Sequence, residues 1–181
     1  GPGVLSTAGV GSAFGRQAGL RYVTGLFIGN NIVVLAVISG LAAIVFSVPV
    51  IRNILLGLSI LYLLYLAFRI ATAGAKIAFI ESKSQPGLIA GITLQFINPK
   101  AYAVNTALFT GFPFMPDALA METLFKFLLL NAIWIPVHLL WLGAGIMIKR
   151  LELAPHIQFR INLLMALAML AVVALALFSN L

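Results

Sequence analysis

The chain has 181 residues, of which 62% are hydrophobic and only 8% are charged, and its mean hydropathy is +1.14. A soluble domain carries about 25% charged residues, so this composition excludes a water-soluble globular protein and indicates an all-α polytopic membrane protein in a lipid bilayer. The net charge of +7 does not indicate nucleic acid binding, because the lysines and arginines stand between apolar runs and form no basic stripe.

Apolar runs predict the membrane-crossing helices, each of which needs about 20 mostly apolar residues. In chain order the runs cover residues 23–47, 53–68, 87–115, 119–148 and 161–181. Pro49 is expected to close the first run, and Asp117 to cap the fourth. The first fifteen residues are uncharged and rich in small residues, but they are too few to span a bilayer. We therefore predict five transmembrane helices plus an N-terminal half-helix, in a single membrane domain over residues 1–181.

The basic residues gather in alternate loops, and this fixes the expected orientation. One side holds eight of the eleven basic residues, namely Arg16, Arg21, Arg69, Lys76, Lys83, Lys149, Arg150 and Arg160. The positive-inside rule places this side, including a loop over residues 71–86, in the cytoplasm and the C-terminus outside. Arg52, Lys126, Asp117 and Glu122 fall on the opposite side.

Two parts of the chain resemble each other. Gly1-Pro2 and Asn98-Pro99-Lys100 each precede a stretch of small residues, a loop and two long apolar helices. The first of these loops is basic and the second is acidic, so the two units are expected to cross the membrane in opposite senses. Repeat one then covers about residues 1–70 and repeat two about residues 87–181, with three helices in each. Inverted repeats of this kind are typical of secondary transporters.

Pro2 is expected to lie inside the hydrocarbon layer, because a helix rises 1.5 Å per residue and Pro2 is then roughly 20 Å from Arg16. A free amino terminus at that depth is costly. We therefore expect upstream residues that complete a truncated first helix. A Gly-Pro remnant of tag cleavage is the alternative.

The stretch LQFINPKAYAVN, residues 94–105, places polar residues inside an apolar run. Inserting a lysine such as Lys100 at mid-membrane costs about 2.5 to 3.5 kcal/mol of free energy on insertion scales. We therefore expect Lys100 to be a fixed positive charge that faces a translocation cavity and pairs with a substrate carboxylate. A snorkelling lysine is the alternative. Pro99 disrupts the helix, and Asn98 is well placed to satisfy the freed backbone groups. Gln95 shares a face with Asn98 and joins the same expected lining.

Further polar residues lie in other apolar runs. Asn30 and Asn31 are adjacent, so one is expected to face the cavity and the other a neighbouring helix. Asn131, Trp134 and His138 form one stripe, in which His138 either relays protons or packs through a hydrogen bond. The expected substrate-binding residues are therefore Pro2, Asn30, Asn31, Gln95, Asn98, Pro99, Lys100, Asn131 and His138. No metal site, cofactor or catalytic group is expected, since no second histidine or carboxylate stands at ligand spacing. Close helix packing is expected at the glycines at positions 25, 29, 40, 143 and 145.

Several motifs resemble the LysE/RhtB family of amino-acid exporters. The family's PGP…GRRAG signature is similar to Gly1-Pro2 followed by GRQAG at residues 15–19, and its second helix is similar to GLFIGNN at residues 25–31 with Gly40-Leu41. LGLSILYLLYLAFRI resembles its third helix and GLIAGITLQFINPKA its fourth, with NPK at residues 98–100. The resemblance implies six helices and export of amino acids or similar metabolites across the bacterial cytoplasmic (inner) membrane. Many members carry an acidic residue where this chain has Asn30 and Asn31, which puts proton coupling here in doubt.

The sequence therefore predicts a secondary transporter, not an enzyme, that exports amino acids or similar small metabolites by alternating access. A cation or metal-ion transporter of a related family is an alternative, disfavoured because the four acidic residues are all expected in loops. A non-transporting membrane scaffold is another. The sequence leaves homo-oligomerisation open.

Overall fold

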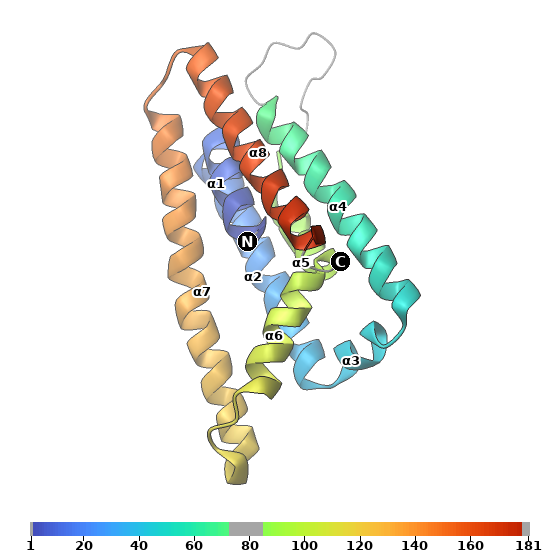
Figure 1. The fold of residues 1–181 in the computed structure, drawn as a ribbon. Helices are drawn as coiled ribbons and strands as arrows, with labels where there is room; N and C mark the ends of the chain where they lie inside the picture. The colour runs from blue at the N-terminus through green and yellow to red at the C-terminus, as the bar shows by residue number, and fades with distance from the viewer. Residues whose placement is uncertain (1, 73–84, 179–181) are drawn as a thin grey trace.

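The computed structural model describes residues 2–72 and 85–178, and the described chain is helical (Figure 1). In chain order its helices are α1 (Pro2–Phe14), α2 (Arg16–Ile38), α3 (Leu41–Phe46), α4 (Pro49–Ala71), α5 (Leu88–Ile97), α6 (Pro99–Gly111), the 3₁₀ turn η1 (Pro116–Ala118), α7 (Leu119–Arg150) and α8 (Pro155–Phe178). Most of the predicted loop over residues 71–86, with Lys76 and Lys83, lies outside the described residues.

Within the described residues, 3 helical segments are long and apolar enough to cross a membrane, namely Arg16–Ile38, Pro49–Ala71 and Pro116–Arg150. The run predicted over residues 87–115 is divided at Asn98 into α5 and α6, with 10 and 13 residues. The N-terminal α1 has 13 residues, as expected of a half-helix.

Two predicted helix boundaries are wrong. The first span begins at Arg16 and ends at Ile38, because Gly40 has a φ of 77° and starts a turn before the short helix α3. Asp117 lies in η1 and does not cap α7, whose N-cap position is Ala118 without a side-chain hydrogen bond. Pro49 begins α4, where the lack of an amide hydrogen costs nothing.

Packing between helices that are far apart in the sequence organises the core. Helix α2 packs against α5 and α6, α7 packs against α1, and α4 packs against α8. The core side chains come from five helices and include Val10, Tyr22, Leu26, Leu66, Ile70, Leu94 and Met169. The outward faces are apolar, as for Leu140 at 72% exposed, which suits a lipid environment.

Glycines set the closest helix approaches, since helices in lipid associate through van der Waals packing. A Cβ at Gly25 would overlap the carbonyl oxygen of Leu88, and one at Gly145 would overlap that of Ala8. A Cβ at Gly29 would lie 2.9 Å from that of Gln95. The packing prediction is therefore confirmed at these positions. It is wrong at positions 40 and 143, where a Cβ would meet nothing within 4 Å.

The basic end of the molecule is tied to the end of α1. Lys149 Nζ, on α7, donates to the carbonyl oxygen of Ala13 at 3.2 Å. The guanidinium of Arg69, on α4, lies 5.8 Å from the ring centre of Phe14. The end of α4, the α1–α2 junction and the α7–α8 turn therefore share one end, the top of Figure 1. This confirms that these predicted basic groups lie together.

The opposite end carries a buried ion pair that the sequence did not indicate. Glu122 Oε1 lies 2.6 Å from Lys126 Nζ, and its Oε2 accepts from the backbone amides of Phe114 at 3.0 Å and Met115 at 2.6 Å. Lys126 Nζ also donates to the carbonyl of Phe109 at 3.4 Å. Glu122 therefore lies in the first turn of α7, not in a loop as predicted, and fixes the α6–α7 connection.

Replacing Glu122 with alanine should destabilise this end, because it leaves Lys126 and two backbone amides without their acceptor. We expect a lower midpoint in thermal unfolding of the detergent-solubilised protein. Asp117→Ala, at an exposed neighbouring carboxylate, is the control and should leave the midpoint unchanged. Equal shifts in both variants would contradict the role given to the ion pair.

Candidate functional site

The break between α5 and α6 satisfies its own backbone. Pro99 begins α6, and the Oδ1 of Asn98 accepts from the backbone amide of Lys100 at 3.2 Å, as an N-cap residue does. The hydroxyl of Tyr102 reaches back across the break and donates to the carbonyl of Phe96 at 3.0 Å. The predicted disruption at Pro99 and the capping role of Asn98 are confirmed. The contribution of Tyr102 was not predicted.

Side chains from α5 and α7 converge on the start of α1. A Cβ built on Gly3 would lie 3.4 Å from Nε2 of His138 and 3.9 Å from Nε2 of Gln95. Pro2, Gln95 and His138 are all buried. Residues far apart in the sequence therefore form one polar cluster beside the break, which we call the Gln95–His138 cluster.

The orientation of His138 follows from its contacts with Trp134. Its Nδ1 lies 2.9 Å from the carbonyl oxygen of Trp134, and the two rings stack with centres 3.5 Å apart at 14°. A carbonyl can only accept, so Nδ1 carries the hydrogen. In the neutral ring Nε2 then has a lone pair, on the side where Gly3 and Gln95 lie. Phe27 of α2 packs on Trp134 with ring centres 5.7 Å apart.

Four asparagines join α2 to α6 and α7, and we call them the asparagine layer: Asn30, Asn31, Asn105 and Asn131. Asn31 and Asn131 exchange two hydrogen bonds between their amides, of 3.1 and 3.0 Å. Asn105 Nδ2 donates to Asn30 Oδ1 at 3.3 Å. The adjacent Asn30 and Asn31 therefore contact different helices, and both serve helix contacts in this conformation.

The α2–α6 half of the asparagine layer is incompletely bonded. Nδ2 of Asn30 and Oδ1 of Asn105 are buried and have no hydrogen-bond partner among the residues that the structure describes. A buried polar group left without a partner costs about 1 to 3 kcal/mol. The Asn31–Asn131 half has reciprocal bonds and is better satisfied. The α2–α6 contact is therefore the weaker half of the layer. Asn105 was not among the predicted site residues.

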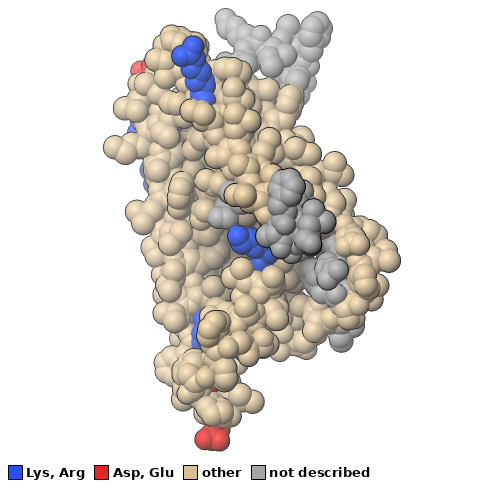
Figure 2. All heavy atoms as spheres, in the orientation of Figure 1, with Lys and Arg blue, Asp and Glu red and all other residues tan. Residues whose placement is uncertain are grey.

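Lys100 lies next to the break but outside the Gln95–His138 cluster. Its side chain is exposed, in contrast to the buried Gln95 and Asn98. The face shown in Figure 2 is mostly uncharged, with a few separate groups of basic atoms. The predicted pairing of Lys100 with a substrate carboxylate remains a prediction.

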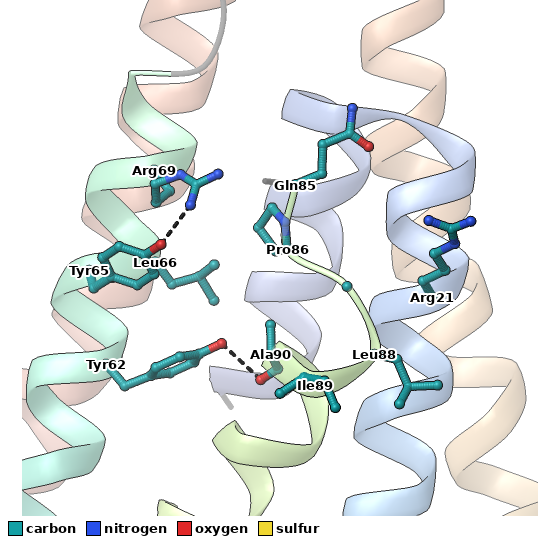
Figure 3. Close-up of a pocket in the computed structure, with 11 residues that line it drawn as sticks. Arg21, Tyr62, Tyr65, Leu66, Arg69, Gln85, Pro86, Leu88, Ile89 and Ala90 are labelled. Atoms are coloured by element: carbon teal, nitrogen blue, oxygen red, sulfur yellow. Dashed lines mark hydrogen bonds between the residues drawn. The ribbon is translucent and has the colours of Figure 1, made fainter. Parts of the chain in front are cut away.

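A pocket of about 420 Å³ opens near the basic end, between α2, α4 and the start of α5 (Figure 3). Arg21 and Arg69 stand on opposite walls, and the hydroxyl of Tyr65 accepts from Arg69 Nη1 at 2.6 Å. Below them the hydroxyl of Tyr62 donates to the carbonyl of Ala90 at 2.8 Å. The sequence indicated these arginines only as markers of topology, because no pattern in it links α2 to α4.

Among residues 2–72 and 85–178, no group of three or more histidine, cysteine, aspartate or glutamate side chains could hold a metal ion.

Comparison with known proteins identifies the family. No curated protein sequence and no solved structure matches the chain. A family model does match, that of the LysE type translocator, over residues 1–180, and it confirms the resemblance seen in the motifs. The chain therefore belongs to the LysE type translocator family, a family of transporters, and is a multi-pass membrane protein.

Proposed function

We propose that this translocator exports amino acids or similar small zwitterions by alternating access of two inverted three-helix units. The basic end faces the cytoplasm of a bacterial cell, and the protein lies in the inner membrane with its C-terminus outside. The observation that carries the proposal is the Gln95–His138 cluster beside a broken helix. Transporters bind substrates where broken helices meet near the membrane midplane.

The pattern of helix contacts supports the inverted repeat. If the two units are related as an inverted repeat, α1 corresponds to α6, α2 to α7, and α4 to α8. The equivalent of the contact between α2 and α6 is then the contact between α7 and α1. The contact between α4 and α8 is its own equivalent, because it joins the two corresponding helices. Both of these packings are present. Helix α5 has no counterpart among the described residues of the first unit.

The chemistry of the cluster suits a substrate with both charges and no net charge. Gln95 carries a neutral amide, and His138 directs a lone pair toward the same region. Amides offer both donors and acceptors, as a carboxylate and an ammonium group require. Among the described residues the buried carboxylate Glu122 is already paired with Lys126 at the far end. This disfavours the cation transporter.

The asparagine layer includes a contact, between α2 and α6, that can break when the transporter changes conformation. Its α2–α6 half leaves a donor and an acceptor unsatisfied, so hydration or substrate can satisfy both when these helices part. Such a contact lowers the cost of opening. The reciprocal Asn31–Asn131 pair keeps α2 attached to α7 in the meantime.

Efflux from proteoliposomes tests the proposal. The full chain is reconstituted with a panel of labelled amino acids inside, and efflux is measured with and without a proton gradient. We expect saturable efflux of at least one zwitterionic amino acid. If that efflux needs the gradient, His138→Gln should abolish the dependence on it. Absence of efflux for the whole panel would rule out this substrate class and favour the membrane scaffold.

A further inference from the structure

The first turn of α1 closes one side of the Gln95–His138 cluster. A Cβ built on Gly3 would lie 3.4 Å from Nε2 of His138, so the backbone of this turn lies in front of that atom. His138 is only 7% exposed, and its other ring nitrogen is bonded to the carbonyl of Trp134. The position of the turn therefore controls how much of Nε2 a ligand can reach.

This turn is not rigid by itself. The hydroxyls of Ser6 and Thr7 both donate to the carbonyl oxygen of Gly3, at 2.9 and 2.8 Å. Hydroxyls that bond back to a carbonyl three or four residues earlier compete with the backbone hydrogen bonds of a helix and often bend it. The amides of a first helical turn also lack partners within the helix. The geometry of the turn therefore depends on its contacts with neighbouring helices.

Tyr22 of α2 supplies such a contact. Its hydroxyl donates to Oγ of Ser6 at 2.9 Å, and its side chain is fully buried. Burying a hydroxyl without a hydrogen bond costs free energy, so this bond favours one position of Ser6 relative to α2. The backbone of Tyr22 lies against α5, where a Cβ at Gly91 would overlap its carbonyl oxygen. Helix α5 also carries Gln95, so Tyr22 links two walls of the cluster.

We propose that Tyr22 is a positioning residue for the Gln95–His138 cluster. Its hydrogen bond to Ser6 holds the first turn of α1 in front of His138 and limits the access of a zwitterionic substrate to Nε2. This inference rests on the function proposed above for the cluster. Loss of the bond increases the fraction of molecules in which the turn has moved away from Nε2. One net hydrogen bond corresponds to about fivefold in that fraction.

Carbethoxylation by diethyl pyrocarbonate tests this positioning in the detergent-solubilised full chain, without a substrate. The reagent reacts with an imidazole nitrogen that carries a lone pair, which in neutral His138 is Nε2. The chain has 2 histidines, and mass spectrometry of the digest separates His138 from the exposed His156, the internal reference. Tyr22→Phe removes only the hydroxyl and should increase the rate at His138 about fivefold relative to His156. An unchanged ratio would overturn the proposal.

Further variants separate positioning from a general loss of stability. Ser6→Ala removes the acceptor of the same bond and should increase the rate as Tyr22→Phe does, and the double variant should show no further increase. Tyr62→Phe also removes a bonded tyrosine hydroxyl, which donates to Ala90 at 2.8 Å between α4 and α5, and should leave the rate unchanged. Additive effects of the first two changes, or an equal increase in Tyr62→Phe, would overturn the proposal.

Efflux kinetics connect the positioning to transport. The probe is the labelled amino acid of the panel that the wild-type protein exports fastest from proteoliposomes. Tyr22→Phe should lower its KM about fivefold, because the apparent affinity rises with the fraction of molecules in the accessible form. An unchanged KM would overturn the control of access, even with faster carbethoxylation. Absence of efflux in the wild-type protein would instead contradict the proposed function, while the carbethoxylation rates would still decide the position of the turn.

Discussion

Gly25→Ala is expected to prevent α2 from packing against α5 and to reduce the yield of monodisperse protein about tenfold or more. The added Cβ would overlap the carbonyl oxygen of Leu88, which is a backbone atom and cannot move to another rotamer. Gly91 on the facing helix has the same restriction against Tyr22, so the clash has no relief from either side. Overpacking of this kind costs about 1 to 3 kcal/mol even where side chains can adjust. Size-exclusion chromatography after solubilisation measures the effect.

The matched control for Gly25→Ala is Gly143→Ala. Gly143 also lies within a long apolar helix, but a Cβ there would meet nothing within 4 Å. The control should give the wild-type yield, or a slightly higher one, since alanine favours helix over glycine by about 1 kcal/mol. A normal yield for Gly25→Ala would show that α2 and α5 lie farther apart than described here.

Lys100→Ala is expected to abolish export while leaving the protein inserted and folded. Its side chain is exposed, so the variant removes a charge without opening a cavity. A lysine at this depth costs about 2.5 to 3.5 kcal/mol on insertion, and its position directly after Pro99 puts it beside the break. We expect it to pair with the substrate carboxylate during transport. The assay is efflux from proteoliposomes at matched protein density.

Two variants accompany Lys100→Ala. Lys100→Arg keeps the charge and should retain measurable export, whereas Arg150→Ala removes a charge at the basic end and should leave export unchanged. Wild-type efflux from Lys100→Ala would refute the pairing and leave the lysine a snorkelling residue. Loss of efflux in Arg150→Ala as well would point to a general effect of net charge.

Local properties of the sequence determined much of the architecture. Low charge and long apolar runs require lipid as the solvent, and this follows from composition alone. Pro99 lacks an amide hydrogen, so the break between α5 and α6 needed no knowledge of neighbouring helices. The grouping of Arg69 and Lys149 at one end follows from the alternation of loops. Each of these features follows from composition, from the order of apolar runs and loops, or from a single residue type, and none requires knowledge of contacts between helices.

Only the tertiary structure decided which residues meet across helices. The pairing of Asn31 with Asn131 joins positions 100 residues apart, and nothing in either local sequence specifies the partner. Glu122 was expected in a loop, but it lies in the first turn of α7. There it accepts hydrogen bonds from backbone amides of the α6–α7 connection, because that connection folds back onto it. The Arg21–Arg69 pocket exists only because α5 enters between α2 and α4. Helix packing in lipid depends on the shapes of facing surfaces, and hydrophobicity alone cannot encode that complementarity.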